Sequence, residues 1–257
     1  MTTMKTNVEI GDFLSEYATW LWGCGATCIR LEKNVRRMAQ ALGVEMDMSI
    51  MPTHVYATVW RGDRSDSYTQ VRRIHKSVIS FDVNTRLSKL SWDLADGRCD
   101  FEQAKTMFED IKNTPTANPW LVLLLASLAN ASFCRLFGGD ALAMLLVFVS
   151  TLFGMRVKQV MIADKIDVRF AFVCSSFVSS VIASGGSLFG WGTTPEIALA
   201  SSVLYLIPGI PYINSVNDML DGHYICAYSR LMEGIVLTAC LSLGLCCGLV
   251  LMNIKMI

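Results

Sequence analysis

The sequence predicts an N-terminal α/β soluble domain followed by an all-α polytopic membrane domain of five transmembrane helices. Of the 257 residues, 53% are hydrophobic and only 17% are charged, whereas globular domains carry about 25% charged residues. Charged side chains are scattered every few residues up to residue 117, and from Pro119 onward they retreat to short links between long apolar stretches. We therefore expect a soluble domain over residues 1–117 and a membrane domain over residues 118–257.

The soluble domain is expected to open with one long helix. Apolar side chains recur there at three- and four-residue steps over residues 9–42, and Gly43 follows as a stop. Three runs rich in β-forming residues come next. Two further helices should begin at Asp82 and Asp100, which can cap them, with Gly97 between the two. The expected strands are 44–51, 54–61 and 67–72, and the expected later helices are 82–96 and 100–112.

Five segments of the membrane domain are candidates to cross a bilayer, for which a helix needs about 20 mainly apolar residues. Asn118 is the expected cap of the first segment and Pro119 its first helical residue, a position that tolerates proline because its missing N–H would be unpaired anyway. The expected spans are 119–137, 140–157, 168–190, 196–213 and 231–252.

The placement of Lys and Arg predicts the orientation of these spans, because cytoplasmic loops carry an excess of positive charge. The link 156–169 is rich in Lys and Arg, whereas the links on the other side hold only Arg135. We therefore expect the N-terminus in the cytoplasm and the C-terminus outside. The opening residues lack the basic and apolar regions of a signal peptide, so we expect none to be cleaved.

Residues 205–218, with the sequence YLIPGIPYINSVND, interrupt the fourth span. Pro208, Gly209 and Pro211 disrupt regular helix hydrogen bonding, and backbone groups freed at membrane depth survive only against protein or a water-filled cavity. Broken helices of this kind build the substrate sites of many transporters. Two interpretations stay open: a broken helix that forms part of a site, or a span that ends at Pro208 and continues as a surface loop.

Polar residues at the span ends are candidates for a substrate pathway, because charge within hydrocarbon is costly and usually functional. Arg135 either contacts substrate or extends to the outer interface, and the deeper Asn130 either hydrogen-bonds another helix or contacts substrate. Small residues in the third and fifth spans either pack helices closely or line a polar path. The full set of pathway candidates is Asn130, Arg135, Asp140, Pro208, Gly209, Pro211, Asn214, Asp218 and Arg230.

Several other functions are disfavoured by the sequence. The formal net charge of +0 argues against a nucleic-acid partner, because such proteins neutralise phosphates. We find no phosphate loop, dinucleotide fingerprint or Ser-His-Asp constellation, so we expect no cofactor and no catalytic residue, and we interpret His54 and His75 as non-catalytic. The cysteines lack a second Cys or His pair at zinc spacing, so no metal site is expected.

Three motifs resemble those of the threonine/serine exporter family: GATCIRLE at 25–32, FCRLFGGD at 133–140 and LIPGIPYINSVNDMLDGHYICAYSRLMEG at 206–234. The resemblance covers nearly the whole chain and implies export of small hydrophilic metabolites across a bacterial inner membrane. Full-length members are two fused membrane halves, and this chain ends after the first. It is therefore similar to the split, two-component form, which is associated with succinate export, whereas fused members are associated with threonine and serine.

The resemblance also implies a partner, namely a small integral membrane protein that supplies the second half of the transporter. An odd number of spans followed by a like repeat gives two halves of opposite orientation, which is a common transporter design. The other expected contacts are the lipid bilayer and a small carboxylate substrate. Gly138 and Gly139 are carried over from the second motif as structural residues.

The chemical roles of the motif residues are a hypothesis. Asn214 and freed backbone amides would bind a carboxylate, and Arg135 or Arg230 would supply positive charge. Asp140 or Asp218 would take up a proton and couple transport to the proton gradient.

Alternative functions are a threonine/serine exporter half and a membrane-anchored sensor, enzyme or assembly protein. The break near Pro208 and the small-residue faces favour a carrier, because a membrane anchor needs neither.

Overall fold

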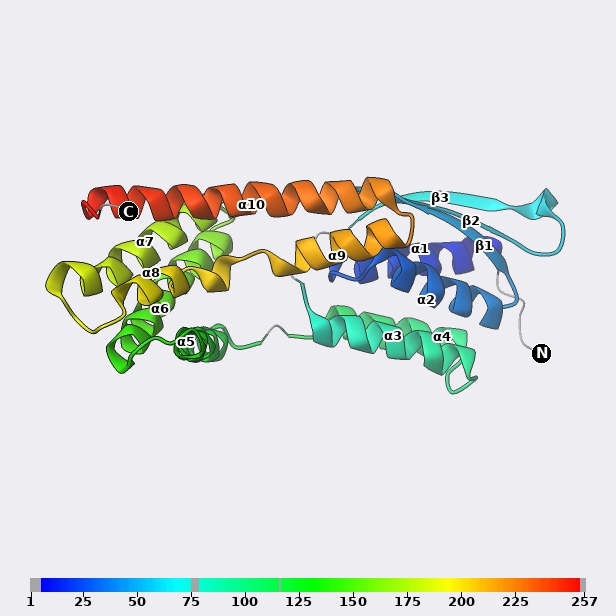
Figure 1. Ribbon diagram of the computed structural model, residues 1–257. Coiled ribbons are helices and arrows are strands. Elements are labelled where there is room, and N and C mark those ends of the chain that lie inside the picture. The colour runs from blue at the N-terminus through cyan, green and yellow to red at the C-terminus, as the bar shows by residue number, and fades with distance from the viewer. Residues whose placement is uncertain (1–5, 75–78, 116, 255–257) are drawn as a thin grey trace. The chain divides into compact units, whose positions relative to one another are not determined.

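A computed structural model describes residues 6–74, 79–115 and 117–254 of the chain (Figure 1). The fold divides into two compact units. The first comprises Met1–Pro115 with Ile210–Leu231, and the second comprises Thr116–Gly209 with Met232–Ile257. Each unit has its own hydrophobic core.

The first unit contains a three-stranded antiparallel sheet in the order β1-β2-β3. The strands are β1 (Glu45–Ile50), β2 (His54–Trp60) and β3 (Tyr68–Arg73), with a short 3-10 turn at Arg64–Asp66. Val55, Ala57 and Val59 point to one face of β2 and are buried, and helix α1 (Asn7–Gly23) packs on that side of the sheet. The three predicted strands are confirmed to within one or two residues at each end.

The remaining helices of this unit are α2 (Cys28–Ala41), α3 (Phe81–Ala95), α4 (Phe101–Lys112), nearly all of α9 (Gly209–Leu220) and the first turns of α10 (Tyr224–Leu251). Helix α2 packs on α3, which packs on α4. The predicted capping role of Asp100 is confirmed, because its side chain accepts a hydrogen bond from Gln103 N–H. The cap of α3 is Ser80 instead of Asp82, which lies in the first turn.

The prediction of one continuous helix over residues 9–42 is wrong, because α1 and α2 are separate helices joined by a turn. Gly25 has a φ of 90° in this turn, a backbone conformation that strongly favours glycine. Thr27 then takes the extended conformation of an N-cap residue. The apolar periodicity continues across the turn, because both helices bury one face in the same core.

Aromatic and aliphatic side chains fill the core of the first unit, around Tyr17 and Phe108. The hydroxyl of Tyr17 donates to the backbone oxygen of Leu87 at 2.8 Å, and burial raises the pKa of Tyr17 well above its usual value. Phe13 packs edge-on against Phe108, with ring centroids 5.8 Å apart. These contacts hold α1, α3 and α4 together.

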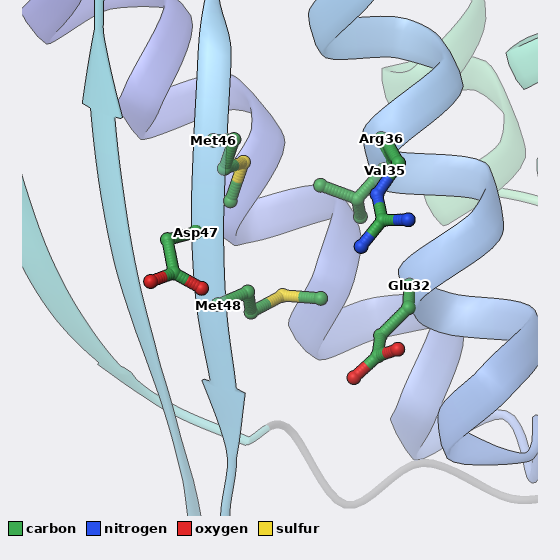
Figure 2. A pocket seen from close by; sticks show the side chains of 6 residues that line it. All are labelled: Glu32, Val35, Arg36, Met46, Asp47 and Met48. Carbon is green, nitrogen blue, oxygen red and sulfur yellow. The ribbon is translucent and has the colours of Figure 1, made fainter. Parts of the chain in front are cut away.

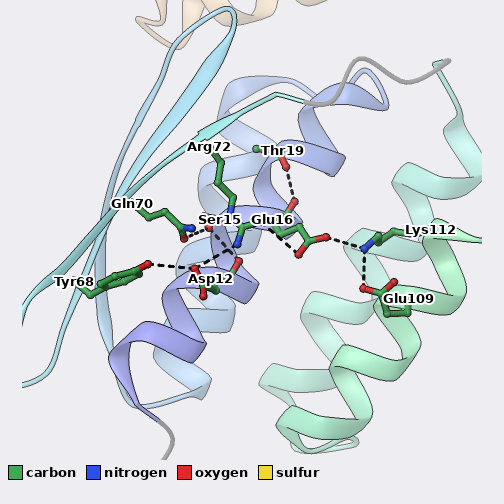
Figure 3. Close-up of polar contacts among 9 residues, drawn as sticks. All are labelled: Asp12, Ser15, Glu16, Thr19, Tyr68, Gln70, Arg72, Glu109 and Lys112. Atoms are coloured by element: carbon green, nitrogen blue, oxygen red, sulfur yellow. Dashed lines mark hydrogen bonds and ion pairs between the residues drawn. The ribbon is translucent and has the colours of Figure 1, made fainter.

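Ion pairs reinforce the same arrangement at its margin (Figure 3). Lys112 of α4 lies 2.7 Å from a carboxylate oxygen of Glu16 on α1, and Arg72 of β3 lies 3.3 Å from Asp12 on α1. Although burial lowers the pKa of Lys112, its hydrogen bonds to Glu109 and Glu16 raise that pKa overall. Helix α1 is therefore tied by charge to both the sheet and α4.

The second unit is a helical bundle of α5 (Pro119–Leu136), α6 (Ala141–Ala163), α7 (Val168–Phe189), α8 (Pro195–Ser201), a 3-10 turn at Leu204–Leu206 and the rest of α10. In the described part of the chain, four helices are long and apolar enough to cross a membrane: α5, α6, α7 and α10. A bent pair, Pro195–Leu206 with Gly209–Leu220, brings the total to five if it is one broken span.

The predicted spans agree with this bundle to different degrees. The first and third match α5 and α7 closely, and Asn118 caps α5 with Pro119 in its first turn, as predicted. The second span was predicted too short, because α6 continues past Arg156 and Lys158 to Ala163. Those two side chains lie over aromatic rings, Arg156 at 4.5 Å from the Trp120 ring and Lys158 at 4.5 Å from the Phe172 ring. The apolar stem of a long basic side chain can lie along apolar surface, so α6 continues as a helix past these two charged residues.

The compact units differ in one respect from the predicted division at residue 117. Residues 210–231, which the sequence analysis placed in the membrane domain as the end of span 4 and a link, pack with the first unit. Helix α10 also begins at Tyr224, earlier than the predicted residue 231. The assignment of residues 1–117 to the aqueous phase stays a prediction.

Candidate functional site

Three of the predicted site residues converge on the turn between α1 and α2 in the first unit. Asn214 and Asp218 come from α9, and Arg230 comes from α10. The Nδ2 group of Asn214 donates to the backbone oxygen of Gly25 at 2.9 Å. The motifs GATCIRLE and PGIPYINSVND, which lie far apart in the sequence, are therefore in direct contact.

Asp218 binds the N-terminus of α2. Its Oδ1 accepts a hydrogen bond from the backbone N–H of Cys28 at 2.8 Å, and Thr27, the N-cap residue, makes no side-chain cap bond. The first N–H groups of a helix lack partners within the helix, and the helix dipole favours negative charge at that end. Asp218 thus supplies the cap that α2 does not supply for itself.

Arg230 completes a buried ion pair with Asp218. The side chain of Asp218 is fully buried and Arg230 is 6% exposed, and Nε of Arg230 lies 3.1 Å from Oδ2 of Asp218. The guanidinium also donates to the backbone oxygen of Ala26 at 2.7 Å and lies 4.6 Å from the centre of the Trp22 ring. Because a buried charge is stable only when it is paired and hydrogen-bonded, each residue requires the other.

Further contacts fasten the start of α10 in the first unit. The thiol of Cys226 donates to the backbone oxygen of Ile50 at 3.4 Å, and Nε2 of His223 lies 3.5 Å from Oε1 of Glu32 on α2. A hydrogen bond with Cys226, together with burial, raises the pKa of the Cys28 thiol, so this cysteine stays protonated. Such a thiol is a poor nucleophile.

The backbone is interrupted at residues 207–208, as the sequence predicted. Pro208 is buried, the N–H of Gly209 donates to the oxygen of Ile207 at 2.9 Å, and α9 begins at Gly209. Pro211 lies in the first turn of α9, where proline is tolerated. The alternative of a surface loop after Pro208 is wrong, because these residues form a helix whose Asn214 and Asp218 are buried.

In the second unit, Gly138 and Gly139 close the end of α5. Their N–H groups donate to the oxygens of Arg135 and Cys134, at 3.0 and 2.9 Å, which is the pattern of a Schellman cap. Gly138 has a φ of 91°, and a Cβ on Gly139 would lie 2.9 Å from the backbone oxygen of Cys134. Arg135 is exposed and donates to the oxygen of Gly139 at 3.1 Å.

Asp140 joins this corner to the segment that precedes α8. One carboxylate oxygen caps α6 by accepting from Ala143 N–H at 2.7 Å, and the other accepts from Thr193 N–H at 2.5 Å. The backbone N–H of Asp140 donates to the Thr194 hydroxyl at 2.9 Å. The hydrogen bonds from Thr193 and Ala143 lower the pKa of Asp140, so the carboxylate stays ionised at neutral pH.

Asn130 is the most deeply buried polar candidate of the bundle. It is 3% exposed, and its Nδ2 donates to Thr151 Oγ1 at 2.6 Å and to the backbone oxygen of Ser201 at 3.0 Å. The amide therefore links α5 to α6 and α8. Of the two interpretations, the interhelical hydrogen bond is confirmed, whereas substrate contact stays a prediction.

A cluster of hydroxyl groups lies beside this link in the same bundle. Ser179 Oγ donates to the backbone oxygen of Ser150 at 3.1 Å and lies 2.9 Å from the Tyr205 hydroxyl. A Cβ on Gly154 would overlap both hydroxyl oxygens. The Oγ atoms of Ser175 and Ser184 are buried and have no hydrogen-bond partner among the described residues.

Helices α7 and α10 pack through small residues, as the packing interpretation predicted. Ser176 Oγ donates to the backbone oxygen of Leu241 at 2.7 Å, and a Cβ on Gly244 would overlap the backbone oxygen of Val173. Close approach of helix backbones requires small side chains at the contact. One small-residue face of α7 thus serves packing, whereas Ser175, Ser179 and Ser184 belong to the polar interior.

Residues 6–74, 79–115 and 117–254 hold no group of three or more His, Cys, Asp or Glu side chains arranged to bind a metal ion. His54 lies in β2, with Nδ1 2.9 Å from the hydroxyl of Thr53, and His75 lies outside the described residues.

Four residues of the two polar networks, around Arg230 and around Asn130, were not predicted from the sequence. They are Trp22, Thr151, Ser201 and Tyr205. Trp22 lies three residues before the start of the GATCIRLE motif, and this proximity is the one signal that the sequence offers for it. The other three are hydroxyl residues within apolar runs, a pattern that is ordinary in membrane helices.

Comparison with known proteins extends these observations. A family model described as a putative threonine/serine exporter matches residues 12–252. A probable succinate transporter subunit YjjP from Klebsiella aerogenes is 28% identical over 239 residues, which cover 91% of this chain and 89% of that protein. A protein of the same description from Escherichia coli K12 is 28% identical over 249 residues, which cover 95% and 91%. No solved structure matches the chain.

Proposed function

Because the chain belongs to the threonine/serine exporter family, we propose that it is one subunit of a two-subunit transporter that exports succinate across the bacterial inner membrane. Family membership and the apolar helices make it a multi-pass membrane protein of an exporter family. Members of this family are transporters and not enzymes. The substrate, the second subunit and the particular membrane are the parts that we propose.

The names of the two relatives support succinate as the substrate and the presence of a second subunit. Both are named as probable subunits of a succinate transporter, and this chain aligns with about nine-tenths of each. The partner that we propose is a small integral membrane protein supplying the second transporter half. Side chains such as Leu121, Leu125 and Phe137 are more than half exposed on the bundle, which suits contact with lipid or with such a partner.

The polar interior of the bundle supports a substrate pathway. A succinate dianion needs hydrogen-bond donors and positive charge. Ser175 and Ser184 offer buried hydroxyl groups that have no partner in the part of the chain that the structure describes, and Asn130 lies in the same bundle. In the described chain, Arg135 has no carboxylate within ion-pair distance, so we propose that its charge attracts the substrate at one end of the pathway.

The contacts of Asp218 and Arg230 favour a different role from the one first proposed for them. The charge of Arg230 is already neutralised by Asp218, and Asp218 also caps α2. We propose that this pair fastens α9 and α10, which follow the interruption at Pro208 and Gly209, to the first unit. Pro211 and Asn214 serve the same purpose, by starting α9 and by binding Gly25.

Asp140 also suits a structural role better than proton transfer. Its pKa is lowered by hydrogen bonds, whereas a proton carrier at neutral pH needs a raised one. We therefore propose that Asp140, with Gly138 and Gly139, braces the corner between α5 and α6.

Labelled succinate efflux from cells tests the proposal. Cells that express this chain with the proposed partner should release labelled succinate faster than cells with either subunit alone. Equal release in all three would contradict the proposal.

The description of the family favours a second candidate, a threonine/serine exporter half. The same cells loaded with labelled threonine distinguish the two candidates, because partner-dependent release of threonine without succinate would favour the second. Fusion of a reporter to each terminus tests the orientation: we predict the N-terminus in the cytoplasm and the C-terminus outside.

A further inference from the structure

A small cavity lies in the first unit between α2 and β1 (Figure 2). Its volume is about 110 Å³, several times the roughly 10–15 Å³ that a cavity needs to hold one water molecule, so it has room for a small metabolite. It is lined by Glu32, Val35, Arg36, Met46, Asp47 and Met48. Neither the proposed pathway nor the contacts of Asp218 and Arg230 account for this cavity.

Two opposite charges face the cavity from α2. Glu32 and Arg36 are four residues apart on the helix, so they lie one above the other on the same face. They are not paired with each other, because no ion pair among the described residues includes Arg36. Glu32 contacts His223, at 3.5 Å, and this contact is an ion pair only when the histidine is protonated.

The opposite wall is the free edge of the sheet. β1 is an edge strand, and the bond from Met51 N–H to the oxygen of His54, at 2.9 Å, marks a hydrogen-bonded pair of the β1–β2 ladder. Such pairs alternate with non-bonded pairs in an antiparallel ladder. Met46 and Met48 therefore lie at non-bonded positions, and their backbone N–H and C=O groups point away from β2.

The methionine side chains of β1 add apolar surface to the cavity. Figure 2 shows Met48 extending from β1 toward α2, between Arg36 and Glu32. Met46 lies on the same side of the strand as Met48, whereas Asp47 lies on the opposite side, as strand alternation requires. Methionine side chains are adaptable and suit small irregular ligands.

We propose that this cavity binds a small zwitterionic α-amino acid. Its carboxylate would bind the Arg36 guanidinium, which presents a fork of donors to a carboxylate. Its ammonium group would bind the Glu32 carboxylate, and Met46 and Met48 would contact its side chain. The free backbone groups of β1 offer further hydrogen bonds.

The charges also exclude other ligands. A dicarboxylate such as succinate would place its second carboxylate near Glu32, where like charges repel. The site is therefore distinct from a succinate pathway, and the inference goes beyond the proposed function. Because Glu32 also contacts His223 in the turn between α9 and α10, an ammonium group bound to Glu32 would compete with that contact, which links amino-acid binding to the position of this turn.

Equilibrium dialysis of the purified full-length chain with radiolabelled L-alanine and L-serine tests the inference. We expect saturable binding that unlabelled succinate does not displace. Arg36→Gln and Glu32→Gln should each weaken it about tenfold or more, because each removes a hydrogen-bonded charge. Lys33→Gln is the matched control: it removes an exposed charge of α2 that does not line the cavity, and binding should change by less than about twofold.

Three results would overturn the inference. They are no saturable binding of either amino acid, displacement by succinate, and unchanged binding by Arg36→Gln, since binding that persists there belongs to another site. Arg36 is exposed, so its variant should fold, and an unchanged thermal unfolding profile checks this. Dialysis requires no transport, so its outcome is independent of the efflux experiment.

Discussion

The buried pair of Asp218 and Arg230 allows the sharpest test of the structure. Asp218→Asn keeps the shape of the side chain and an oxygen that can accept from Cys28 N–H, but it removes the negative charge. Arg230, which is 6% exposed, would then be a buried cation without a counter-charge. We expect the variant to be strongly destabilised.

The magnitude follows from the burial of both groups. Removing one partner of a buried ion pair costs about 3–5 kcal/mol. For a domain of this size each kcal/mol lowers the melting temperature by about 2–4 °C, so Asp218→Asn should lower it by roughly 6–20 °C. Arg230→Met should be destabilised too, because it leaves the Asp218 carboxylate buried with only the Cys28 N–H bond. The double variant should lose less than the sum of the two by about 1–3 kcal/mol, since neither charge is then left alone.

The assay is thermal unfolding of the full-length chain in detergent micelles, followed by tryptophan fluorescence. Trp22 lies against the Arg230 guanidinium and should contribute to the signal. Asp221→Asn is the matched control, because Asp221 is an exposed carboxylate just beyond α9, and its melting temperature should hardly change. Melting of Asp218→Asn within 2 °C of the unmodified chain, or simple additivity in the double variant, would refute the buried-pair argument.

Three further predictions concern the bundle. Asn130→Ala should cost about 0.6–2 kcal/mol, because Thr151 Oγ1 loses its donor, and thermal unfolding in detergent should show the loss; an unchanged melting temperature would contradict the three-helix link. Gly154→Ala should cost about 1–3 kcal/mol through overpacking, whereas Gly185→Ala, whose Cβ would lie 3.8 Å from its nearest neighbour, should be tolerated in the same assay. Asp140 has a lowered pKa, so its stabilising contribution is complete above the usual value of 3.8 and is lost as the pH falls through the lowered pKa. The melting temperatures of the unmodified chain and of Asp140→Asn should therefore differ at pH 7 and converge in acid, and a constant difference would contradict this reasoning.

Local sequence signals were sufficient for much of the fold. The strands, the caps Asp100 and Asn118, and the apolar helices α5 and α7 follow from residues close in sequence. The turn after α1 was missed because the apolar periodicity runs through it, although Gly25 is the residue that makes the turn. The length of α6 was missed because Arg156 and Lys158 look like loop residues until their aromatic neighbours are known.

The candidate site shows where such reasoning stops. The sequence singled out Asn214, Asp218 and Arg230, and the interruption at Pro208, but it could not say what they contact. Their partners are backbone groups of Gly25, Ala26 and Cys28, and a backbone N–H or C=O leaves no mark in a sequence. Only the folded chain shows that these three residues contact the GATCIRLE motif.

Reconstitution into proteoliposomes is the most direct test of the claim that this chain is half of a succinate exporter. Vesicles that contain the purified chain together with its proposed membrane partner should release entrapped labelled succinate, and vesicles with either protein alone should retain it. Release by this chain alone at the full rate, or no release by the pair, would contradict the account.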